Sequence, residues 1–222
     1  MNIAPIAYFH SPVSGKFGLP RQSGLAASLE GEVELLPPFN REEALRGLDG
    51  FDYLWLIWEF SLNDTGDTSS QLTVRPPRLG GNVRVGVFAS RSPFRPNRLG
   101  LSCIRIAGID AGRGVIRVLG ADLADGTPIF DIKPYVPYAD SHPEARGGFT
   151  DSKDWKPLKV EFPEAVLQAG FTQTELEALR EMLAQDPRPQ YQDDTHREYG
   201  LTFKGRNVRF RVADGVLTVL TC

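Results

Sequence analysis

Short runs in which apolar and polar residues alternate make up most of the first two-thirds of the chain, separated by Gly, Pro, Asn and Asp. Alternation with a period of two is typical of half-buried β-strands, and helical periodicity is scarce in this part. The pattern predicts eight strands, at residues 3–10, 31–36, 53–60, 72–75, 83–90, 101–109, 115–119 and 129–135. Eight short strands at this spacing indicate a closed barrel or a sandwich.

Two helices are predicted outside this pattern. Residues 41–47 are polar and helix-forming, and the glycine at position 47 is placed to end a short helix that decorates the barrel. Further on, Thr172 and Glu175 have the spacing of a capping box and open a second helix. That helix carries an apolar stripe, formed by Leu176, Leu179 and Leu183.

The last part of the chain has a different pattern of apolar and polar residues. Residues 141–157 are polar and lack regular alternation, so we place a domain boundary there. Near the C-terminus, residues 208–212 alternate, residues 214–215 supply an Asp-Gly turn, and residues 216–220 return as a second strand. The chain is therefore expected to be mainly β, with a small α+β C-terminal domain. The two predicted domains are residues 1–145 and 146–222.

Composition excludes several classes of protein. A chain of 222 residues that is 41% hydrophobic can bury a full core. The N-terminus lacks a basic start followed by an apolar run, and no stretch approaches the roughly 18 consecutive apolar residues that span a bilayer. Cys103 and Cys222 stand far apart without a CxxC pair, and the three histidines are scattered singly. We therefore expect a cytoplasmic protein with no membrane segment, disulfide framework or metal site.

Charge is distributed unevenly. The formal net charge is -3, yet residues 71–109 contain no lysine, aspartate or glutamate. This stretch holds seven arginines: Arg75, Arg78, Arg84, Arg91, Arg95, Arg98 and Arg105. Solvated strand surfaces usually mix both signs, whereas the planar fork of arginine suits carboxylates, phosphates and bases. The tract therefore indicates a binding role.

The C-terminal hairpin is also basic on its exposed face. Its basic residues oppose a single acid, Glu198, and are Arg197, Lys204, Arg206, Arg209 and Arg211. This face is a candidate second contact for a polyanion, although solvated strand arginines are the commoner explanation of such a pattern.

The remaining chemistry gathers in two polar turns. A glycine-containing segment at 110–114 precedes a strand rather than a helix, so we interpret it as a hairpin turn and not as a nucleotide loop. Residues 91–102 contain two proline turns that hold Arg91 and Arg95 at defined positions. Residues 122–128 form a second polar turn, whose carboxylates can balance arginines or bind ribose hydroxyls. From the residues alone, this combination predicts anion or nucleotide binding.

The same turns carry a resemblance to a known family. Residues 91–102 closely resemble the TsaA/TrmO family of tRNA methyltransferases. The resemblance extends almost from end to end, through residues 17–25, 74–82, 125–128, 131–135, 199–200 and 207–210. Three positions depart from the family pattern: Ser23 and Arg98 stand where proline is common, and Ser61 stands where histidine is common.

The resemblance implies a closed β-barrel methyltransferase that is not of the Rossmann type. Its cofactor would be S-adenosylmethionine, and its acceptor would be N6 of N6-threonylcarbamoyladenosine at position 37 of tRNA. Carried onto this chain, the cofactor site would comprise Arg21, Gln22, Ser23, Phe60, Ser61, Arg91, Leu101, Asp125, Gly126, Thr127 and Pro128. The resemblance also implies a homodimer with sites near the subunit interface, and the tRNA anticodon loop as partner.

Methyl transfer requires an aligned acceptor nitrogen, and a ureido-like nitrogen must also lose its proton. The candidate proton acceptors share one predicted strand face and are Asp131, Lys133 and Tyr135. A structural ion pair explains the charged two equally well. The candidate RNA contacts are Arg75, Arg78, Arg84, Arg95, Arg209 and Arg211. Two alternatives stay open: a non-catalytic RNA- or nucleotide-binding barrel, and a methyltransferase with a different acceptor.

Overall fold

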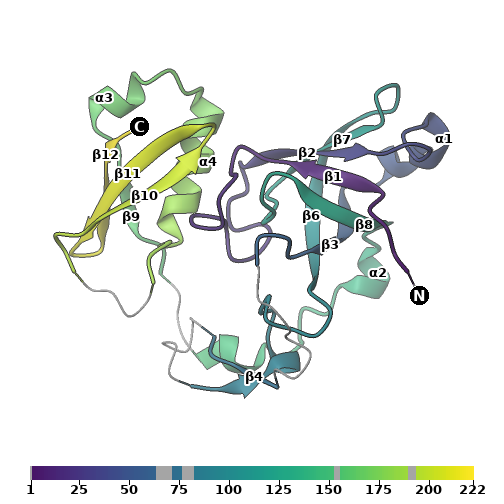
Figure 1. Ribbon diagram of the computed structural model, residues 1–222, viewed down its shortest axis with the longest axis horizontal. Coiled ribbons are helices and arrows are strands. Elements are labelled where there is room, and N and C mark those ends of the chain that lie inside the picture. Colours follow the sequence, from purple (N-terminus) through teal and green to yellow (C-terminus); the bar gives the residue numbers. More distant parts are fainter. Residues whose placement is uncertain (1, 64–71, 77–82, 153–155, 190–193) are drawn as a thin grey trace.

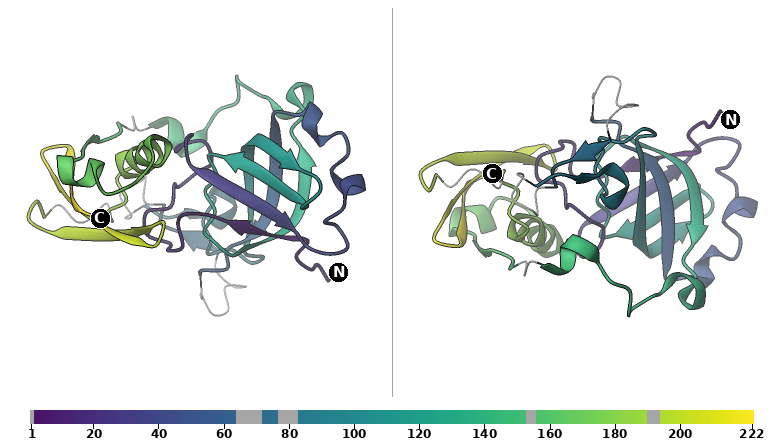
Figure 2. Two further views of the ribbon diagram at one scale, coloured as in Figure 1. Left: turned by 90° about the horizontal axis from the view of Figure 1, so that it is seen from above. Right: turned by 90° about the horizontal axis from the view of Figure 1, so that it is seen from below.

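The computed structural model describes residues 2–63, 72–76, 83–152, 156–189 and 194–222. Six strands close into an antiparallel barrel in the order β1-β2-β7-β6-β3-β8 (Figures 1 and 2). They are β1 (Ala7–His10), β2 (Glu30–Leu35), β3 (Tyr53–Glu59), β6 (Leu99–Asp110), β7 (Val115–Leu119) and β8 (Thr127–Pro134). The prediction of a mainly β chain is confirmed. Because the sheet is closed, the fold is a barrel and not a sandwich.

Alternation along these strands fills the barrel with apolar side chains. Phe9, Leu54, Leu56, Ile104 and Ile116 are among the residues buried inside it. The residues between them on each strand point outward, because successive side chains of a strand lie on opposite faces. The period-two pattern of the sequence therefore identifies the core.

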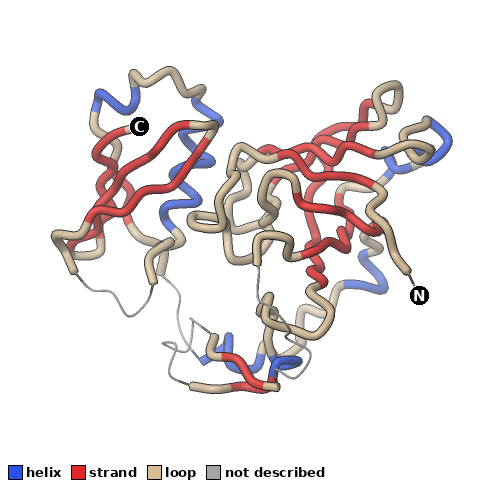
Figure 3. Tube along the Cα trace, in the orientation of Figure 1, coloured by secondary structure: helices blue, strands red, loops and turns tan. Residues whose placement is uncertain are grey.

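Two of the eight predicted strands do not enter the barrel. β4 (Thr73–Val74) and β5 (Val85–Gly86) pair with each other in a separate two-stranded sheet, seen at the bottom of Figure 3. β5 runs directly into the 3-10 helix η3 (Val87–Ala89), where the sequence predicts more strand. These pieces are too short to span the barrel, and closure needs no further strand because β8 pairs with both β1 and β3.

One end of the barrel is covered by α1 (Glu42–Leu45) and the 3-10 helix η1 (Leu48–Gly50). α1 lies within the predicted helix, and its Leu45 is buried in the barrel core. Gly47, with φ of 84°, ends this helix as expected, since a left-handed conformation carries no steric penalty at glycine.

The C-terminal domain is a four-stranded sheet in the order β10-β11-β12-β9, with a helix beside it. Its strands are β9 (Lys159–Glu161), β10 (Glu198–Phe203), β11 (Arg206–Ala213) and β12 (Val216–Thr221). The helices of this half are α2 (Pro137–Asp140), η4 (Gly148–Ser152), α3 (Glu164–Leu167) and α4 (Gln173–Ala184). The α+β character of this part of the chain is thus confirmed. Two strands are additions to the predicted hairpin of β11 and β12: β9, which is parallel to β12, and β10, which pairs with β11. Within the described ranges, none of the helices has the length and apolar character needed to cross a membrane.

α4 begins as the sequence predicts. The side chain of Thr172 accepts a hydrogen bond from the Glu175 N–H at 3.2 Å, and the Glu175 carboxylate accepts one from the Thr172 N–H at 2.9 Å. The hydrogen bond from Lys204 and the Thr172 N–H hold the pKa of Glu175 below its usual range. Because the folded-state pKa is lowered, the stability contributed by this capping box is lost as pH falls through that pKa.

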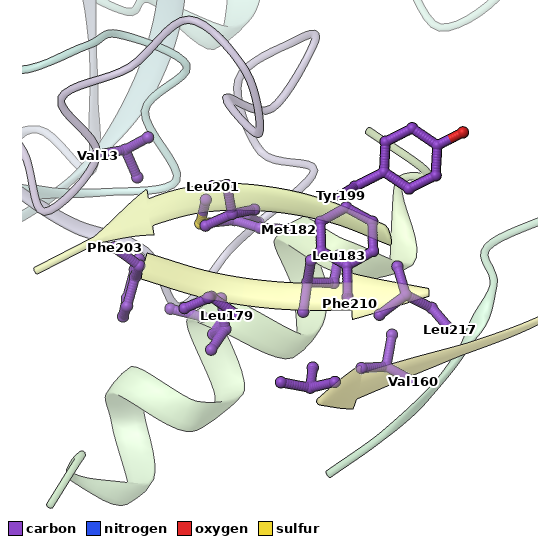
Figure 4. Close-up of a cluster of buried hydrophobic side chains, with 14 of the residues drawn as sticks. Val13, Val160, Leu179, Met182, Leu183, Tyr199, Leu201, Phe203, Phe210 and Leu217 are labelled. Atoms are coloured by element: carbon purple, nitrogen blue, oxygen red, sulfur yellow. The ribbon is translucent and has the colours of Figure 1, made fainter. Parts of the chain in front are cut away.

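Residues 11–29, which connect β1 to β2 and are called the strap below, belong to both halves of the molecule. Val13 of the strap is fully buried in the core cluster of the C-terminal domain, as Figure 4 shows. Phe17 stacks against Tyr199 and Phe210, with ring centroids 6.5 and 6.3 Å away. The C-terminal core is therefore completed by a segment that precedes it by more than a hundred residues.

Polar contacts hold the same arrangement. Glu181 of α4 accepts hydrogen bonds from the N–H of Ser28 at 2.7 Å and from its hydroxyl at 3.2 Å. The N–H of Lys204 donates to the carbonyl of Pro12 at 2.7 Å. The strap thus lies between the barrel end and the C-terminal domain.

Candidate cofactor site

The antiparallel barrel brings together several segments that are far apart in the sequence. The ends of β1, β3 and β7 and the starts of β2, β6 and β8 lie at one end of the barrel, called the site rim below. The strap follows β1, Phe60 and Ser61 follow β3, Arg91 precedes β6, and residues 125–128 lead into β8. Most of the predicted cofactor residues therefore meet at this rim.

Arg91 is exposed and reaches the strap. Its guanidinium donates a hydrogen bond to the side-chain oxygen of Gln22 at 2.5 Å, and the Gln22 amide donates to the carbonyl of Arg21 at 2.6 Å. Arg95 donates to the carbonyl of Ser90 at 3.1 Å, so this guanidinium braces the turn that presents Arg91. The stiffness expected of the turn thus has a side-chain contribution in addition to its prolines.

A hydrogen-bond chain runs along the barrel wall beneath this pair. The indole N–H of Trp58 donates to the Ser102 hydroxyl at 3.0 Å, and that hydroxyl donates to Asp122 Oδ1 at 2.6 Å. The backbone N–H of Ser23 also donates to the Asp122 carboxylate. Position 23 commonly holds proline in the family that the chain resembles, and proline has no N–H to make this contact.

Asp122 is a carboxyl group of the rim whose pKa is raised above its usual range. Burial raises the pKa of Asp122, while the hydrogen bonds from Ser102 and from backbone N–H groups, together with the charge of Arg91, act in the opposite direction. A carboxyl group surrounded by protein but supplied with several donors is a frequent feature of functional sites.

The turn at 125–128 is fastened to β1 and the strap. The N–H of Asp125 donates to the carbonyl of Val13 at 2.9 Å, and Asp125 Oδ1 accepts from the N–H of Ser11 at 3.1 Å. Gly126 has φ of 76°, which this turn requires, and the buried Thr127 hydroxyl donates to the carbonyl of Ala124 at 2.8 Å. Pro128 pairs with Tyr8 in the barrel.

Phe60 and Ser61 leave β3 beside the start of β6. The Phe60 ring meets Trp58 edge-on, with ring centroids 4.4 Å apart, and Ser61 is exposed in the following turn. Arg98, which departs from the family pattern, forms an ion pair with Glu59 at 3.2 Å. The charge of Arg98 is therefore paired with Glu59 at the end of β3 and stabilises the rim.

Two predicted cofactor residues point elsewhere. The guanidinium of Arg21 donates to the carbonyls of Asp186 at 3.2 Å and Arg188 at 3.5 Å, which ties the strap to the segment after α4. Leu101 lies on the outer face of β6 and is 55% exposed, whereas its neighbour Ser102 points inward. Within this chain, neither side chain joins the Arg91–Gln22 pair.

The candidate proton acceptors share a face, but it is the outer face of the barrel. Lys133 and Asp131 form an ion pair at 2.9 Å, with the Lys133 side chain exposed and the Asp131 side chain partly exposed. The Tyr135 ring packs near Tyr53 and Trp55, with centroids 6.1 and 6.0 Å away. Their contacts are those of an ion pair and an aromatic cluster.

The candidate RNA contacts of the central tract lie partly on the two-stranded sheet. Arg75 is exposed after β4, and Arg84 donates to the hydroxyl of Thr73 at 3.2 Å. Arg78 lies outside the described residues.

The basic face of the C-terminal hairpin is partly neutralised. Arg209 is paired with Glu198, and Lys204 is paired with Glu175. Arg211 is exposed on the same strand as Arg209. The sequence already indicates Glu198 as the acid opposed to this face, whereas Glu175 belongs to α4 and is not revealed by the hairpin sequence.

Sequence reasoning missed Trp58, Ser102 and Asp122 as one network. A signal for Ser102 existed, because alternation with the apolar Ile104 places this hydroxyl inside the barrel, where a polar group needs a partner. Asp122 falls in the polar turn that the sequence marks, but nothing local indicates that this carboxylate meets β6 and the strap.

The rim has side chains suited to the groups of S-adenosylmethionine. Arg91 can pair with a carboxylate, Asp125 can accept hydrogen bonds from ribose hydroxyls, and Phe60 offers an aromatic surface to a base. Among the described residues, no group of three or more His, Cys, Asp or Glu side chains could hold a metal ion.

Comparison with known proteins identifies the family. The family model for the tRNA-methyltransferase O N-terminal domain matches residues 8–141, and that for the TrmO C-terminal domain matches residues 156–222. The chain is 42% identical to a tRNA (adenine(37)-N6)-methyltransferase of Escherichia coli, covering 94% of this chain and 92% of that protein. It is 40% identical to one of Eikenella corrodens, covering 76% and 95%. A crystal structure of TrmO from Pseudomonas aeruginosa superimposes with a TM-score of 0.81 at 33% identity, covering 100% of this chain and 97% of that one. The chain therefore belongs to the TrmO family.

Proposed function

We propose that this protein transfers a methyl group from S-adenosylmethionine to N6 of N6-threonylcarbamoyladenosine at position 37 of tRNA. The observation that carries the proposal is the likeness, over nearly the whole chain, to the tRNA (adenine(37)-N6)-methyltransferase of E. coli. Because the proposed acceptor is tRNA, we place the reaction in the cytoplasm.

The site rim supports a division of labour in cofactor binding. Arg91, aligned by Gln22, pairs with the carboxylate of the cofactor, and Asp125 accepts hydrogen bonds from its ribose. Phe60 lies against the adenine. When bound, the cofactor supplies an electrophilic methyl group on a sulfonium. The residues of the rim then hold the acceptor nitrogen in line with that methyl group and exclude water, so positioning provides most of the rate enhancement.

The acceptor nitrogen also loses a proton. Asp131, Lys133 and Tyr135 stay candidates for receiving it, and the exposed ion pair between the first two favours a structural role for them. The tRNA anticodon loop is proposed to contact Arg75, Arg84 and the braced turn at Arg95, with Arg209 and Arg211 of the proposed domain 146–222 as a second contact.

The outer face of β3 and β6 supports a homodimer. Leu99 and Leu101 of β6 are exposed on this face, with Leu101 opposite Ile57, and the exposed Tyr53 lies further along β3. A row of exposed apolar side chains along two neighbouring strands is typical of a contact surface. In such a dimer, Leu101 lies at the subunit interface, which reconciles its outward direction with a role near a cofactor.

Methyl transfer to defined tRNA tests the proposal. Purified protein, S-adenosylmethionine and tRNA from a strain that lacks this activity are incubated, and the digested nucleosides are analysed by mass spectrometry. We expect a methyl group gained on N6-threonylcarbamoyladenosine and none on tRNA that lacks the threonylcarbamoyl group. Cofactor binding without transfer supports a non-catalytic nucleotide-binding barrel instead, and equal rates on both tRNAs support a different acceptor.

Replacing Arg91 with alanine tests the cofactor site. The exposed Arg91 contributes little to folding, so the melting temperature should stay nearly unchanged, while the Kd for S-adenosylmethionine should rise about 10-fold through loss of a charge-assisted hydrogen bond. Isothermal titration calorimetry measures the Kd, and differential scanning calorimetry measures the melting temperature. Arg113→Ala, an exposed arginine in the turn between β6 and β7 at the opposite end of the barrel, is the matched control and should bind normally. A large loss of stability in Arg91→Ala with normal binding makes Arg91 a structural residue.

A further inference from the structure

Asp122 occupies a position that none of the predicted roles explains. It follows β7 after Gly120, whose N–H donates to the carbonyl of Leu29 in the strap at 2.9 Å. The carbonyl of Gly120 in turn accepts from the N–H of Gly24 at 2.8 Å. The segment leading to Asp122 is therefore held against the strap by its backbone.

The hydrogen-bond chain that ends at Asp122 has a fixed direction. An indole N–H can only donate, so the Ser102 oxygen accepts from Trp58 at 3.0 Å. The single Ser102 proton is then directed to Asp122 at 2.6 Å, which must accept it. These two hydrogen bonds hold Asp122 Oδ1 against the barrel wall formed by β3 and β6.

On its other side, Asp122 faces the strap and the central turn. The Ser23 N–H donates to its carboxylate, and the positive charge of Arg91 acts on it. Arg91 is joined to the strap at Gln22, one residue before Ser23. Asp122 therefore connects a rigid wall to the two elements that carry the cofactor contacts.

We propose that Asp122 is a positioning residue of the cofactor site, which anchors the strap at Ser23 and orients Arg91 from the barrel wall. This inference rests on the cofactor site proposed above. Asp122 acts through Arg91 and the strap, and its role does not require contact with the cofactor.

Asp122→Asn separates positioning from packing. The variant has the same shape, and its side-chain oxygen can still accept from Ser102, but its amide N–H₂ group then faces the Ser23 N–H and the Arg91 charge. Because burial raises the pKa of Asp122, the folded state is less stable once this group ionises, and a neutral amide removes that cost at neutral pH. A purely structural contribution of Asp122 would change the melting temperature and leave binding by the folded protein unchanged.

The experiment measures the Kd for S-adenosylmethionine of the full-length protein by isothermal titration calorimetry. Asp122→Asn should weaken binding about 10-fold, and Ser102→Ala, which removes the donor on the wall side, should weaken it several-fold. In methyl transfer, the KM for the cofactor should rise by a similar factor while kcat at saturation changes less. Asp110→Asn, a carboxylate at the opposite end of the barrel, is the matched control and should bind normally.

A double-mutant cycle with Arg91→Ala identifies the route of the effect. If Asp122 acts through Arg91, Asp122→Asn should weaken binding by clearly less than 10-fold when Arg91 is already absent, since coupled residues are not additive. Normal binding by Asp122→Asn and Ser102→Ala, with weakened binding by Arg91→Ala, overturns this inference and leaves the proposed cofactor site intact. Normal binding by Arg91→Ala overturns the proposed site itself.

Discussion

Replacing Phe17 with alanine is expected to weaken cofactor binding as well as to destabilise the protein. The Phe17 ring stacks against Tyr199 and Phe210 of the C-terminal sheet, and truncation of such a ring removes about 3 kcal/mol of unfolding free energy. The strap continues from Phe17 to Gln22 and the Ser23 N–H. Loosening its anchor should therefore release Gln22 from Arg91, and we expect the Kd for S-adenosylmethionine to rise about 10-fold or more.

Leu217→Ala provides the control for this first prediction. Leu217 is fully buried in the same cluster but lies on β12, which β11 separates from β10. Leu217→Ala should lower the free energy of unfolding by about 3 kcal/mol and leave the cofactor affinity of the folded protein unchanged. Urea unfolding and calorimetric titration at a temperature where every variant is folded measure both quantities. If Phe17→Ala loses stability but binds the cofactor like the parent protein, the packing of Phe17 is not needed to hold Gln22 against Arg91.

Gly100→Ala is expected to disrupt the barrel wall. A Cβ built at Gly100 would fall well inside the van der Waals radius of the Trp58 indole, which is buried directly opposite on β3. Overpacking a site of this kind removes about 2–3 kcal/mol of unfolding free energy, because the ring must leave its rotamer. A displaced indole can no longer donate to Ser102, so cofactor affinity should fall together with stability.

Two further variants isolate the cause. Gly50→Ala introduces a methyl group into open space at the other end of the barrel, and it should change neither stability nor binding. Trp58→Phe combined with Gly100→Ala provides room for the added methyl group, so the pair should lose less stability than the sum of the single changes. Tryptophan fluorescence and thermal melts measure the outcome. Equal stability of Gly100→Ala and the parent protein contradicts the prediction.

Much of the fold could be predicted because strand and helix signals are local. Alternation placed Leu54 and Ile104 inside the barrel, and the spacing of Thr172 and Glu175 marked the start of α4. The predictions that failed concern segments whose structure depends on the strands with which they pair. β4 and β5 have strand-like sequences, but they pair with each other because the barrel is already closed by β8.

The candidate site was predictable only in part. The resemblance named Arg91, Gln22 and residues 125–128, which the structure does bring to one rim. It did not indicate that Arg21 turns to the C-terminal domain or that Leu101 points outward. A motif records which residues occur together, whereas their directions depend on strand register and on the domain packed beside them.

The sequence by itself determined the presence of the six barrel strands, the capping box of α4, the Asp-Gly turn and the arginine tract that surrounds Arg91. These depend on periodicity and on residues a few positions apart. Only the tertiary structure decided which end of the barrel carries the site, that the strap completes the C-terminal core, and that Trp58, Ser102 and Asp122 form one chain. Closure of the barrel joins strand ends that are distant in the sequence, and hydrogen bonds between such ends leave no local pattern from which they could be read.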